Sequence, residues 1–247
     1  MFGRTLRHTG VRANLRDGVT AADIFLRNLM EAIEQQPTLA YSRCWQSRTQ
    51  IAAKRIFDVV ISLSLLLLLF PFLLAIAVAV KLSSPGPIFY RWKVVGCGGR
   101  PFTGYKFRSM VANADALRDE LTSLNEMTGP VFKIANDPRI TEVGAWLRKY
   151  SLDELPQLYS VLKGDMSLVG PRPPLVTEFE QFTEYQKQKV AVKPGITCLW
   201  QVSGRNQISD FDEWVRLDLE YIGRWSLSLD LAILMRTVET VFSGSGK

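Results

Sequence analysis

Residues 59–80 form an uninterrupted apolar run, VVISLSLLLLLFPFLLAIAVAV, in which 22 consecutive positions carry no charge. A helix rises about 1.5 Å per residue, so this run is just long enough to cross a hydrocarbon core about 30 Å thick. The core helix of a water-soluble domain does not need so long an uncharged segment. The sequence therefore predicts that this segment lies in a membrane.

Two features of the run favour a kinked, re-entrant helix over a simple crossing. Pro71 lies near its middle, where proline removes a backbone hydrogen bond and kinks a helix. Lys54 and Arg55 precede the run and Lys81 follows it. A crossing helix carries its positive excess on the cytoplasmic side, so cations at both ends favour a helix that enters and leaves on that face. A spanning helix is the alternative.

The apolar run divides the chain into three parts. We expect residues 1–50 to form a basic arm with an amphipathic helix, residues 51–82 the re-entrant membrane helix, and residues 83–247 a cytoplasmic domain with C-terminal helices on the membrane surface. The formal net charge of the whole chain is +6, which favours acidic partners such as nucleic acid, an anionic membrane face or phosphorylated substrates.

The third part predicts an α+β fold that is mainly helical. Residues 88–95 and 100–110 are rich in aromatic and β-branched side chains and flank the glycine cluster 96–99, which is typical of a β-hairpin. The other expected elements are a polar helix over 113–122, a short apolar strand over 199–202, and helices over 209–221 and 227–242.

Rare residue types exclude several kinds of chemistry. His8 is the only histidine, so a Ser-His-Asp triad, a histidine base or a histidine-ligated metal is not expected. The three cysteines are scattered and form no CxxC pair, which argues against a zinc site or a disulfide framework. A bound metal would therefore be a hard ion with oxygen ligands, such as Mg²⁺.

The stretch 151–173, SLDELPQLYSVLKGDMSLVGPRP, has an unusual density of acids, prolines and arginine. Ser151 and Glu154 match a capping box, which by itself explains two acids near a helix start. A catalytic interpretation competes with it. Asp153 near a helix N-terminus would stay ionised and would attack phosphorus, and Glu154 would bind Mg²⁺.

Basic residues near this stretch are candidates for binding phosphate. Arg148 shortly precedes the acids, and Arg172 is stiffened by the prolines on either side. Lys106 and Arg108, in YKFRSM, are either solvated charges or anion ligands. A further turn, 203–206, displays Arg205.

Seven motifs, in this order, resemble those of the bacterial sugar transferases, also called monotopic phosphoglycosyl transferases or polyprenyl-phosphate hexose-1-phosphate transferases. They are KRIFD (54–58), SSPGPIFY (83–90), YKFRSM (105–110), DPRIT (137–141), LRKYSLDELPQL (147–158), GDMSLVGPRP (164–173) and KPGITCLWQVSGR (193–205). The resemblance runs from about residue 54 to the C-terminus. With only about 50 residues before it, we expect a small, single-unit member.

The resemblance implies transfer of a hexose 1-phosphate from a UDP-sugar to undecaprenyl phosphate at the cytoplasmic face of the bacterial inner membrane, with Mg²⁺ as cofactor. It implies that Asp153 attacks the phosphate bearing the sugar and that Glu154 serves the metal. Lys106 and Arg148 correspond to the family's basic positions. The family's helix breaks at Ser-Pro, whereas this chain has Phe70-Pro71. The product would initiate exopolysaccharide, capsule or O-antigen synthesis, with galactose or glucose as the first expectation for the sugar.

Two other classes of function were weighed. A membrane-anchored nucleic-acid-binding protein fits the charge, but no helix-turn-helix, RRM or zinc motif is present, so nucleic acid is not an expected partner. A non-catalytic scaffold of a polysaccharide assembly complex would keep the fold without the chemistry. The intact pair Asp153 and Glu154 argues against a scaffold. Further expected partners are the lipid bilayer, a second copy of the chain, and downstream glycosyltransferases.

Overall fold

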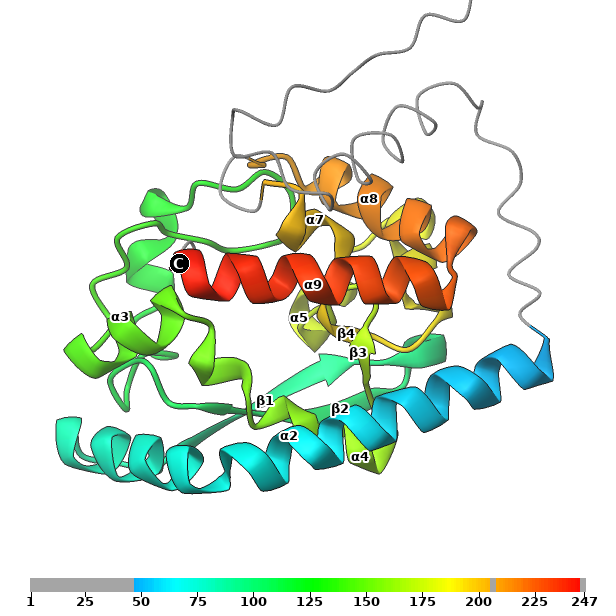
Figure 1. Cartoon of the computed structure of the whole chain (residues 1–247). Coiled ribbons are helices and arrows are strands. Elements are labelled where there is room, and N and C mark those ends of the chain that lie inside the picture. The colour runs from blue at the N-terminus through cyan, green and yellow to red at the C-terminus, as the bar shows by residue number, and fades with distance from the viewer. Residues whose placement is uncertain (1–46, 205–207, 245–247) are drawn as a thin grey trace, which may run out of the picture. The chain divides into compact units, whose positions relative to one another are not determined.

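The structure is a computed structural model that describes residues 47–204 and 208–244, which fall in one compact unit (Figure 1). The expected basic arm, its amphipathic helix over 20–36, and Arg205 lie outside the described residues.

The described unit is mostly helical, with two small sheets, as the predicted α+β class requires. Its helices are α2 (Arg48–Ser83), α3 (Glu142–Lys149), α4 (Gln157–Lys163), α5 (Val176–Phe179), α6 (Glu184–Lys187), α7 (Leu199–Val202), α8 (Phe211–Arg224) and α9 (Leu227–Ser243). Its strands are β1 (Phe89–Val95), β2 (Pro101–Phe107), β3 (Ser167–Val169) and β4 (Gly195–Thr197), with 3₁₀ turns at Cys97–Gly99, Asp119–Leu124, Leu152–Glu154 and Gln188–Ala191.

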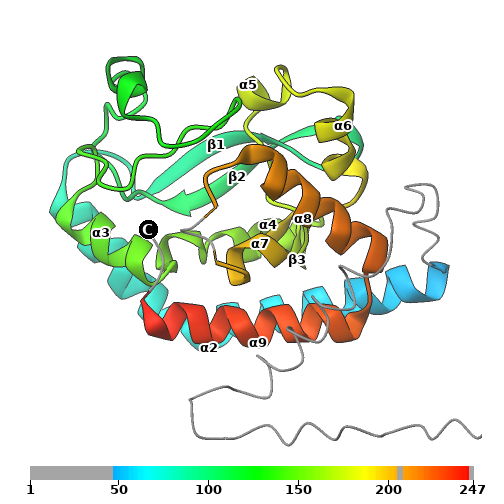
Figure 2. The same cartoon turned by 90° about the horizontal axis from the view of Figure 1, so that it is seen from above.

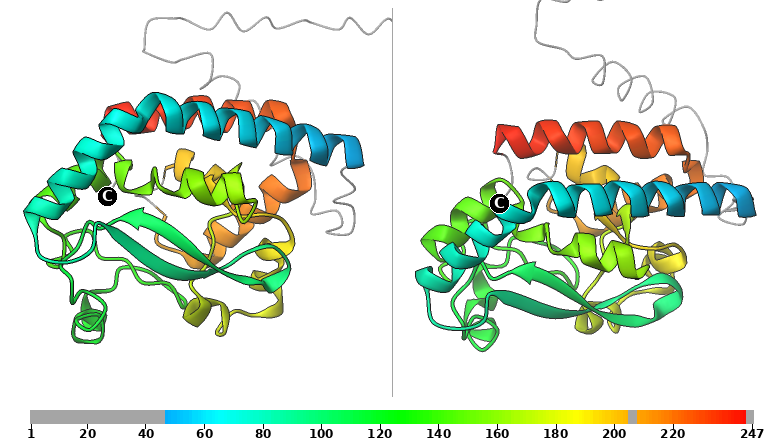
Figure 3. Two further views of the ribbon diagram at one scale, coloured as in Figure 1. Left: turned by 90° about the horizontal axis from the view of Figure 1, so that it is seen from below. Right: turned by 60° about the horizontal axis from the view of Figure 1, so that its bottom comes forward.

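The apolar run lies within α2, a continuous helix of 36 residues that begins at a capping box made by Ser47 and Gln50. The helix continues through Pro71 and bends along its length (Figure 3). Within the described part of the chain, α2 alone is long and apolar enough to cross a membrane. Most of its large apolar side chains are exposed to the surroundings. Re-entry into the membrane stays a prediction.

The C-terminal half of α2 is fastened to the domain by a small apolar core. Ile76 and Val80 of α2 pack with Phe107 of β2 and Leu147 of α3, and all four side chains are buried. Because α3 leads directly into the acidic turn, this core ties the membrane helix to the candidate site.

The predicted β-hairpin is confirmed. Strands β1 and β2 pair antiparallel from Phe89 opposite Phe107 to Val95 opposite Pro101. Gly98, at the turn, has a φ of 67°, a left-handed conformation that favours glycine. The hairpin lies on the side of the unit opposite α2 and α9 (Figure 2).

A second, parallel sheet joins two motifs that are distant in sequence. Ser167 of β3 pairs with Gly195 of β4, and Val169 pairs with Thr197. A Cβ on Gly195 would lie 2.1 Å from the backbone nitrogen of Gly170, so only glycine allows this approach. The sheet fixes the start of the segment that carries Arg172.

Two predicted elements are wrong. Residues 113–122 form turns and part of a 3₁₀ turn in place of a polar helix. Only Ala114 in that segment is buried, so a helix there would lack the apolar face that stabilises short helices. Residues 199–202 form helix α7 in place of a strand, because the Gln201 side chain accepts a hydrogen bond from the backbone N–H of Cys198 and closes a helical turn. The predicted helices over 209–221 and 227–242 are confirmed as α8 and α9.

Candidate active site

The acidic pair lies in a tight turn between α3 and α4. Ser151 has φ 53° and ψ 24°, and Leu152–Glu154 form one 3₁₀ turn. Ser151 makes no side-chain cap bond, so the capping-box interpretation is wrong. Pro156 occupies the N-cap position of helix α4, and Asp153 lies in the 3₁₀ turn that immediately precedes that helix. A non-glycine residue in the left-handed conformation destabilises the fold by on the order of 1 kcal/mol. Here that conformation of Ser151 reverses the chain, so that both acids are buried against one cavity.

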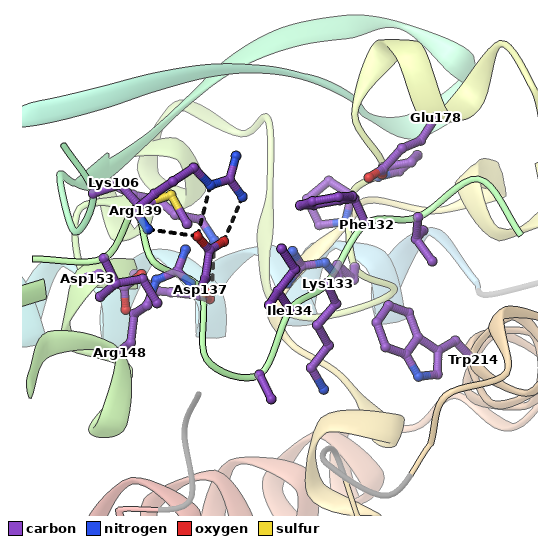
Figure 4. Close-up of a pocket in the computed structure, with 18 of the residues that line it drawn as sticks. Lys106, Phe132, Lys133, Ile134, Asp137, Arg139, Arg148, Asp153, Glu178 and Trp214 are labelled. Carbon is purple, nitrogen blue, oxygen red and sulfur yellow. Dashed lines mark hydrogen bonds and ion pairs between the residues drawn. The ribbon is translucent and has the colours of Figure 1, made fainter. Parts of the chain in front are cut away.

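The cavity has a volume of about 500 Å³ and brings together residues from separate motifs (Figure 4). This volume is within the range of small-molecule binding sites. Five of the seven side chains predicted for catalysis or phosphate binding line it: Lys106, Arg148, Asp153, Glu154 and Arg172. The structure thus places three cations around two carboxylates.

Lys106 forms an ion pair with the acidic turn. Its Nζ lies 2.8 Å from Oε1 of Glu154, and both side chains are largely buried. The ammonium also lies over the Trp92 ring, 4.4 Å from its centroid. Burial lowers the pKa of Lys106, and the neighbouring Glu154 opposes that effect. Lys106 is therefore held in β2 at the edge of the site, with its charge directed at the acidic pair Asp153 and Glu154.

Arg148 lies on the other side of the turn, in the last turn of α3. Its Nε donates to Oγ of Ser109 at 3.0 Å, which leaves the terminal guanidinium nitrogens directed toward other partners. Burial lowers the pKa of Arg148, while the charge of Asp153 raises it. Because an arginine keeps its proton far above neutral pH, Arg148 contributes a permanent positive charge beside Asp153.

The structure places Arg108 elsewhere. Its guanidinium is buried and donates to the carbonyl oxygens of Pro85 at 2.7 Å, Ser84 at 2.7 Å and Val80 at 3.2 Å. These carbonyls end helix α2, which cannot satisfy them itself. Arg108 is therefore a cap for the membrane helix and does not line the cavity, unlike the phosphate ligand expected from the sequence.

Asp137 and Arg139 are among the charged residues that line the cavity but were not predicted from the sequence as site residues. They form a buried bidentate pair, with Arg139 Nε 2.9 Å and a terminal nitrogen 2.6 Å from the two oxygens of Asp137. Burial raises the pKa of Asp137, but the hydrogen bonds from Arg139 outweigh it and hold that pKa below its usual value. The DPRIT motif contained a signal for this pair, because an acid two residues before an arginine can form a bidentate ion pair with it.

A second buried pair also borders the cavity. Lys189 Nζ lies 2.7 Å from an oxygen of Asp218, and both side chains are almost inaccessible. Burial raises the pKa of Asp218, and Lys189 counteracts that effect. Only Lys189 lines the cavity. No local sequence pattern links the two residues, so only the packing of α8 reveals the pair.

The two acids of the turn fit a magnesium ion. The described residues contain no cluster of three or more acidic, histidine or cysteine ligands. Mg²⁺ is commonly bound by only one or two carboxylates, with substrate phosphates and water completing the octahedron. Asp153 and Glu154, in a cavity with cations suited to phosphates, supply a donor set of that kind.

The family follows from comparison with known proteins. Residues 49–244 match the family described as bacterial sugar transferase. The chain belongs to this family.

Individual relatives share 40–44% of their aligned residues with this chain. It is 42% identical over 237 residues to the galactosyl transferase CpsE of Streptococcus agalactiae, covering 96% of this chain and 53% of that protein. It is 44% identical over 197 residues to the undecaprenyl-phosphate galactose phosphotransferase of Salmonella typhimurium, covering 78% and 41%. It is 40% identical over 198 residues to the exopolysaccharide production protein ExoY of Sinorhizobium fredii, covering 78% and 87%. The chain thus spans about half or less of the length of the first two relatives.

Proposed function

We propose that this protein transfers a hexose 1-phosphate from a UDP-sugar to undecaprenyl phosphate, giving undecaprenyl-diphospho-sugar and UMP. The observation that carries the proposal is the burial of Asp153 and Glu154 in one cavity with Lys106, Arg148 and Arg172. The names of the relatives support the class of acceptor and a role at the start of exopolysaccharide or capsule synthesis.

The reaction proceeds in two displacements at one phosphorus atom. A carboxylate oxygen of Asp153 attacks the phosphate that bears the sugar, and the bond to the UMP oxygen breaks. A phosphate oxygen of the lipid carrier then attacks the same phosphorus and releases the Asp153 carboxylate. Negative charge on the phosphoryl oxygens grows in both steps, and the fixed cations Lys106, Arg148 and Arg172 stabilise it.

Glu154 and Asp153 are the residues that would hold Mg²⁺. The ion, when bound, neutralises charge on the diphosphate. Lys106 Nζ lies 2.8 Å from the Glu154 carboxylate and so limits its rotation. The prolines flanking Arg172 reduce the conformational entropy that this side chain's backbone loses on binding.

Galactose is the sugar that the comparisons favour. Three relatives carry galactose or galactosyl in their names, and one carries glucose. Attachment of the sugar phosphate to the lipid carrier would be the first membrane step of polysaccharide assembly.

The site lies beside a membrane-facing surface formed by α2 and α9. Both helices run along the same side of the described unit (Figures 2 and 3). The exposed apolar residues of α9 recur at three- or four-residue spacing, as expected of one helix face: Leu227, Leu231, Met235, Val238 and Phe242. Such a face suits a helix that lies in the membrane interface. We place the protein on the cytoplasmic face of the inner membrane, with α2 re-entrant.

The deciding experiment is a donor panel. Purified full chain in lipid nanodiscs is incubated with Mg²⁺, undecaprenyl phosphate and UDP-galactose, UDP-glucose or UDP-N-acetylhexosamines, and UMP release is measured. We expect release with galactose or glucose donors. Release from none of these donors would sink the proposal.

Asp153→Asn tests the nucleophile. The amide is nearly isosteric but is not a carboxylate nucleophile, so UMP release should fall at least about 10³-fold. Asp165→Asn is the matched control, because Asp165 is partly exposed, pairs with Lys163 and lies outside the cavity. Full activity in Asp153→Asn would show that another group attacks phosphorus.

A further inference from the structure

The cavity that holds the acidic turn continues into an aromatic end, which the chemistry above does not use. Figure 4 shows Phe132 and Trp214 at the end of the pocket away from Lys106, Arg148 and Asp153. The aromatic end is defined by five lining residues: Phe132, Phe182, Trp200, Phe211 and Trp214.

Ring contacts hold this end rigid. Trp200 of α7 and Trp214 of α8 stack with their centroids 4.1 Å apart and their planes 8° apart. Phe211 meets Trp214 edge-on at 6.4 Å and packs against Phe182 at 5.0 Å. These four rings are buried, whereas Phe132 is only partly buried. The result is a preformed wall with one adjustable ring.

The wall contains two unused hydrogen-bond donors. The indole nitrogens of Trp200 and Trp214 are buried and have no hydrogen-bond partner within the described part of the chain. A buried donor without an acceptor destabilises a protein, and such groups are rare away from ligand sites. Both nitrogens have almost no accessible surface, and Phe132 is the most exposed ring of the wall.

Cations connect the aromatic end to the acidic turn. Lys189 lines the cavity, and its Nζ lies 5.7 Å from the centre of the Phe211 ring. Arg172 and Arg148 line the same cavity beside the acids. The cavity therefore offers aromatic surface to the flat ring of a ligand and positive charge to a diphosphate at the other end of that ligand.

We propose that the aromatic end binds the uracil base of the nucleotide donor. This rests on the proposed function, which it deepens by assigning a base-binding subsite. A nucleobase has two flat faces that stack on aromatic side chains. The edge of uracil carries two carbonyl oxygens, which match donors that have no acceptor of their own.

The experiment measures equilibrium binding of three probes to the full chain in nanodiscs: UMP, CMP and galactose 1-phosphate. Phe132→Leu is the first variant, because this partly exposed ring can be removed without opening the core. Trp214→Phe is the second and keeps a ring while removing the N–H. Trp146→Leu is the matched control, since Trp146 is exposed and lies outside the cavity.

We expect Phe132→Leu to weaken UMP binding about tenfold, as loss of one stacking partner does. Trp214→Phe should weaken UMP binding about threefold and reduce the preference for UMP over CMP, because one donor to a carbonyl is lost. Binding of galactose 1-phosphate should stay unchanged in both variants, and Trp146→Leu should match the wild type.

Two results would overturn the subsite. Loss of galactose 1-phosphate binding with UMP binding retained would assign the aromatic end to the sugar. An equal loss for all three probes would show that the rings only support the fold. The donor panel separates these failures from failure of the proposed function. UMP release by the wild type supports the transferase function whatever the variants bind. UMP binding without turnover refutes the transferase function but not the base-binding subsite.

Discussion

At the scale of single residues, burial in the candidate site changes the pKa of common side chains. Lys106 is fixed by Glu154 and by the ring of Trp92, and burial lowers its pKa. A lysine with a lowered pKa loses its charge at a lower pH than an exposed lysine does. The stabilisation that Lys106 gives to phosphoryl oxygens is therefore present at neutral pH and is lost as the pH rises through that pKa.

This predicts the alkaline side of the pH–rate profile. Lys106→Met should lower kcat about 10²–10³-fold, as removal of one transition-state donor does. Lys106→Arg should retain part of the activity and extend it to higher pH, because guanidinium stays protonated. UMP release measured across pH checks both, with Lys93→Arg, at an exposed position of β1, as the control. An unchanged alkaline limit in Lys106→Arg would mean that another group sets it.

The same scale limits what motif reading can assign. Lys106 and Arg108 are two residues apart in one motif, and the sequence predicts the same role, phosphate binding, for both. In the structure Lys106 lines the cavity, whereas Arg108 binds three carbonyl oxygens at the end of α2. Lys106 lies within strand β2, whereas Arg108 follows its end and lies beside the carbonyl groups at the end of α2. Packing between distant segments therefore decides which of the two cations lines the cavity.

At the scale of elements, α2 is joined to α4 and α9 by polar contacts as well as to the domain by its apolar core. Arg55 donates to the carbonyl oxygens of Val161 at 2.5 Å and Leu162 at 2.7 Å, which end helix α4. Lys54 lies 2.6 Å from Asp230 of α9, which is fully buried. The KRIFD motif thus does more than flank an apolar run with positive charge. It fastens the membrane helix to the helices around the site.

Arg108→Ala tests the capping assignment. Loss of three charge-assisted hydrogen bonds should lower the free energy of unfolding by about 2–4 kcal/mol. In the folded fraction, KM for the UDP-sugar should stay close to the wild-type value, because Arg108 lies outside the cavity. Thermal unfolding and steady-state kinetics measure the two effects, with exposed Arg91→Ala as the control. A raised KM with unchanged stability would restore Arg108 as a phosphate ligand.

At the scale of the whole described unit, the exposed apolar surfaces of α2 and α9 lie on one side and the hairpin on the other (Figure 2). A membrane covers such surfaces at a large gain in free energy. This arrangement is consistent with the proposed reaction, in which the acceptor is a lipid-linked phosphate.

The proline inside α2, Pro71, predicts a topology that can be measured. Tags at residues 1 and 247 should both be accessible from the cytoplasm in the wild type. Pro71→Leu restores a backbone donor and should straighten α2, so a fraction of the chains should expose one tag on the far side. Phe72→Leu, at the adjacent exposed position, is the control. Tags on opposite sides in the wild type would rule out the re-entrant helix, and no change in Pro71→Leu would show that the bend does not depend on proline.

The sequence by itself determined the membrane helix, the hairpin, the acidic pair and the family, because these depend on local composition, on spacing and on motif order. It failed where local patterns were ambiguous: the segment 113–122 lacks a buried face, and the residues 199–202 are closed into a helical turn by Gln201. Only the tertiary structure decided which charges share a cavity. The left-handed conformation of Ser151 directs the two acids toward the cavity. Arg139 and Lys189 line the cavity from distant segments, whereas Arg108 lies outside it and caps α2. Side-chain packing between segments far apart in the chain sets these positions, and a local pattern carries no record of it.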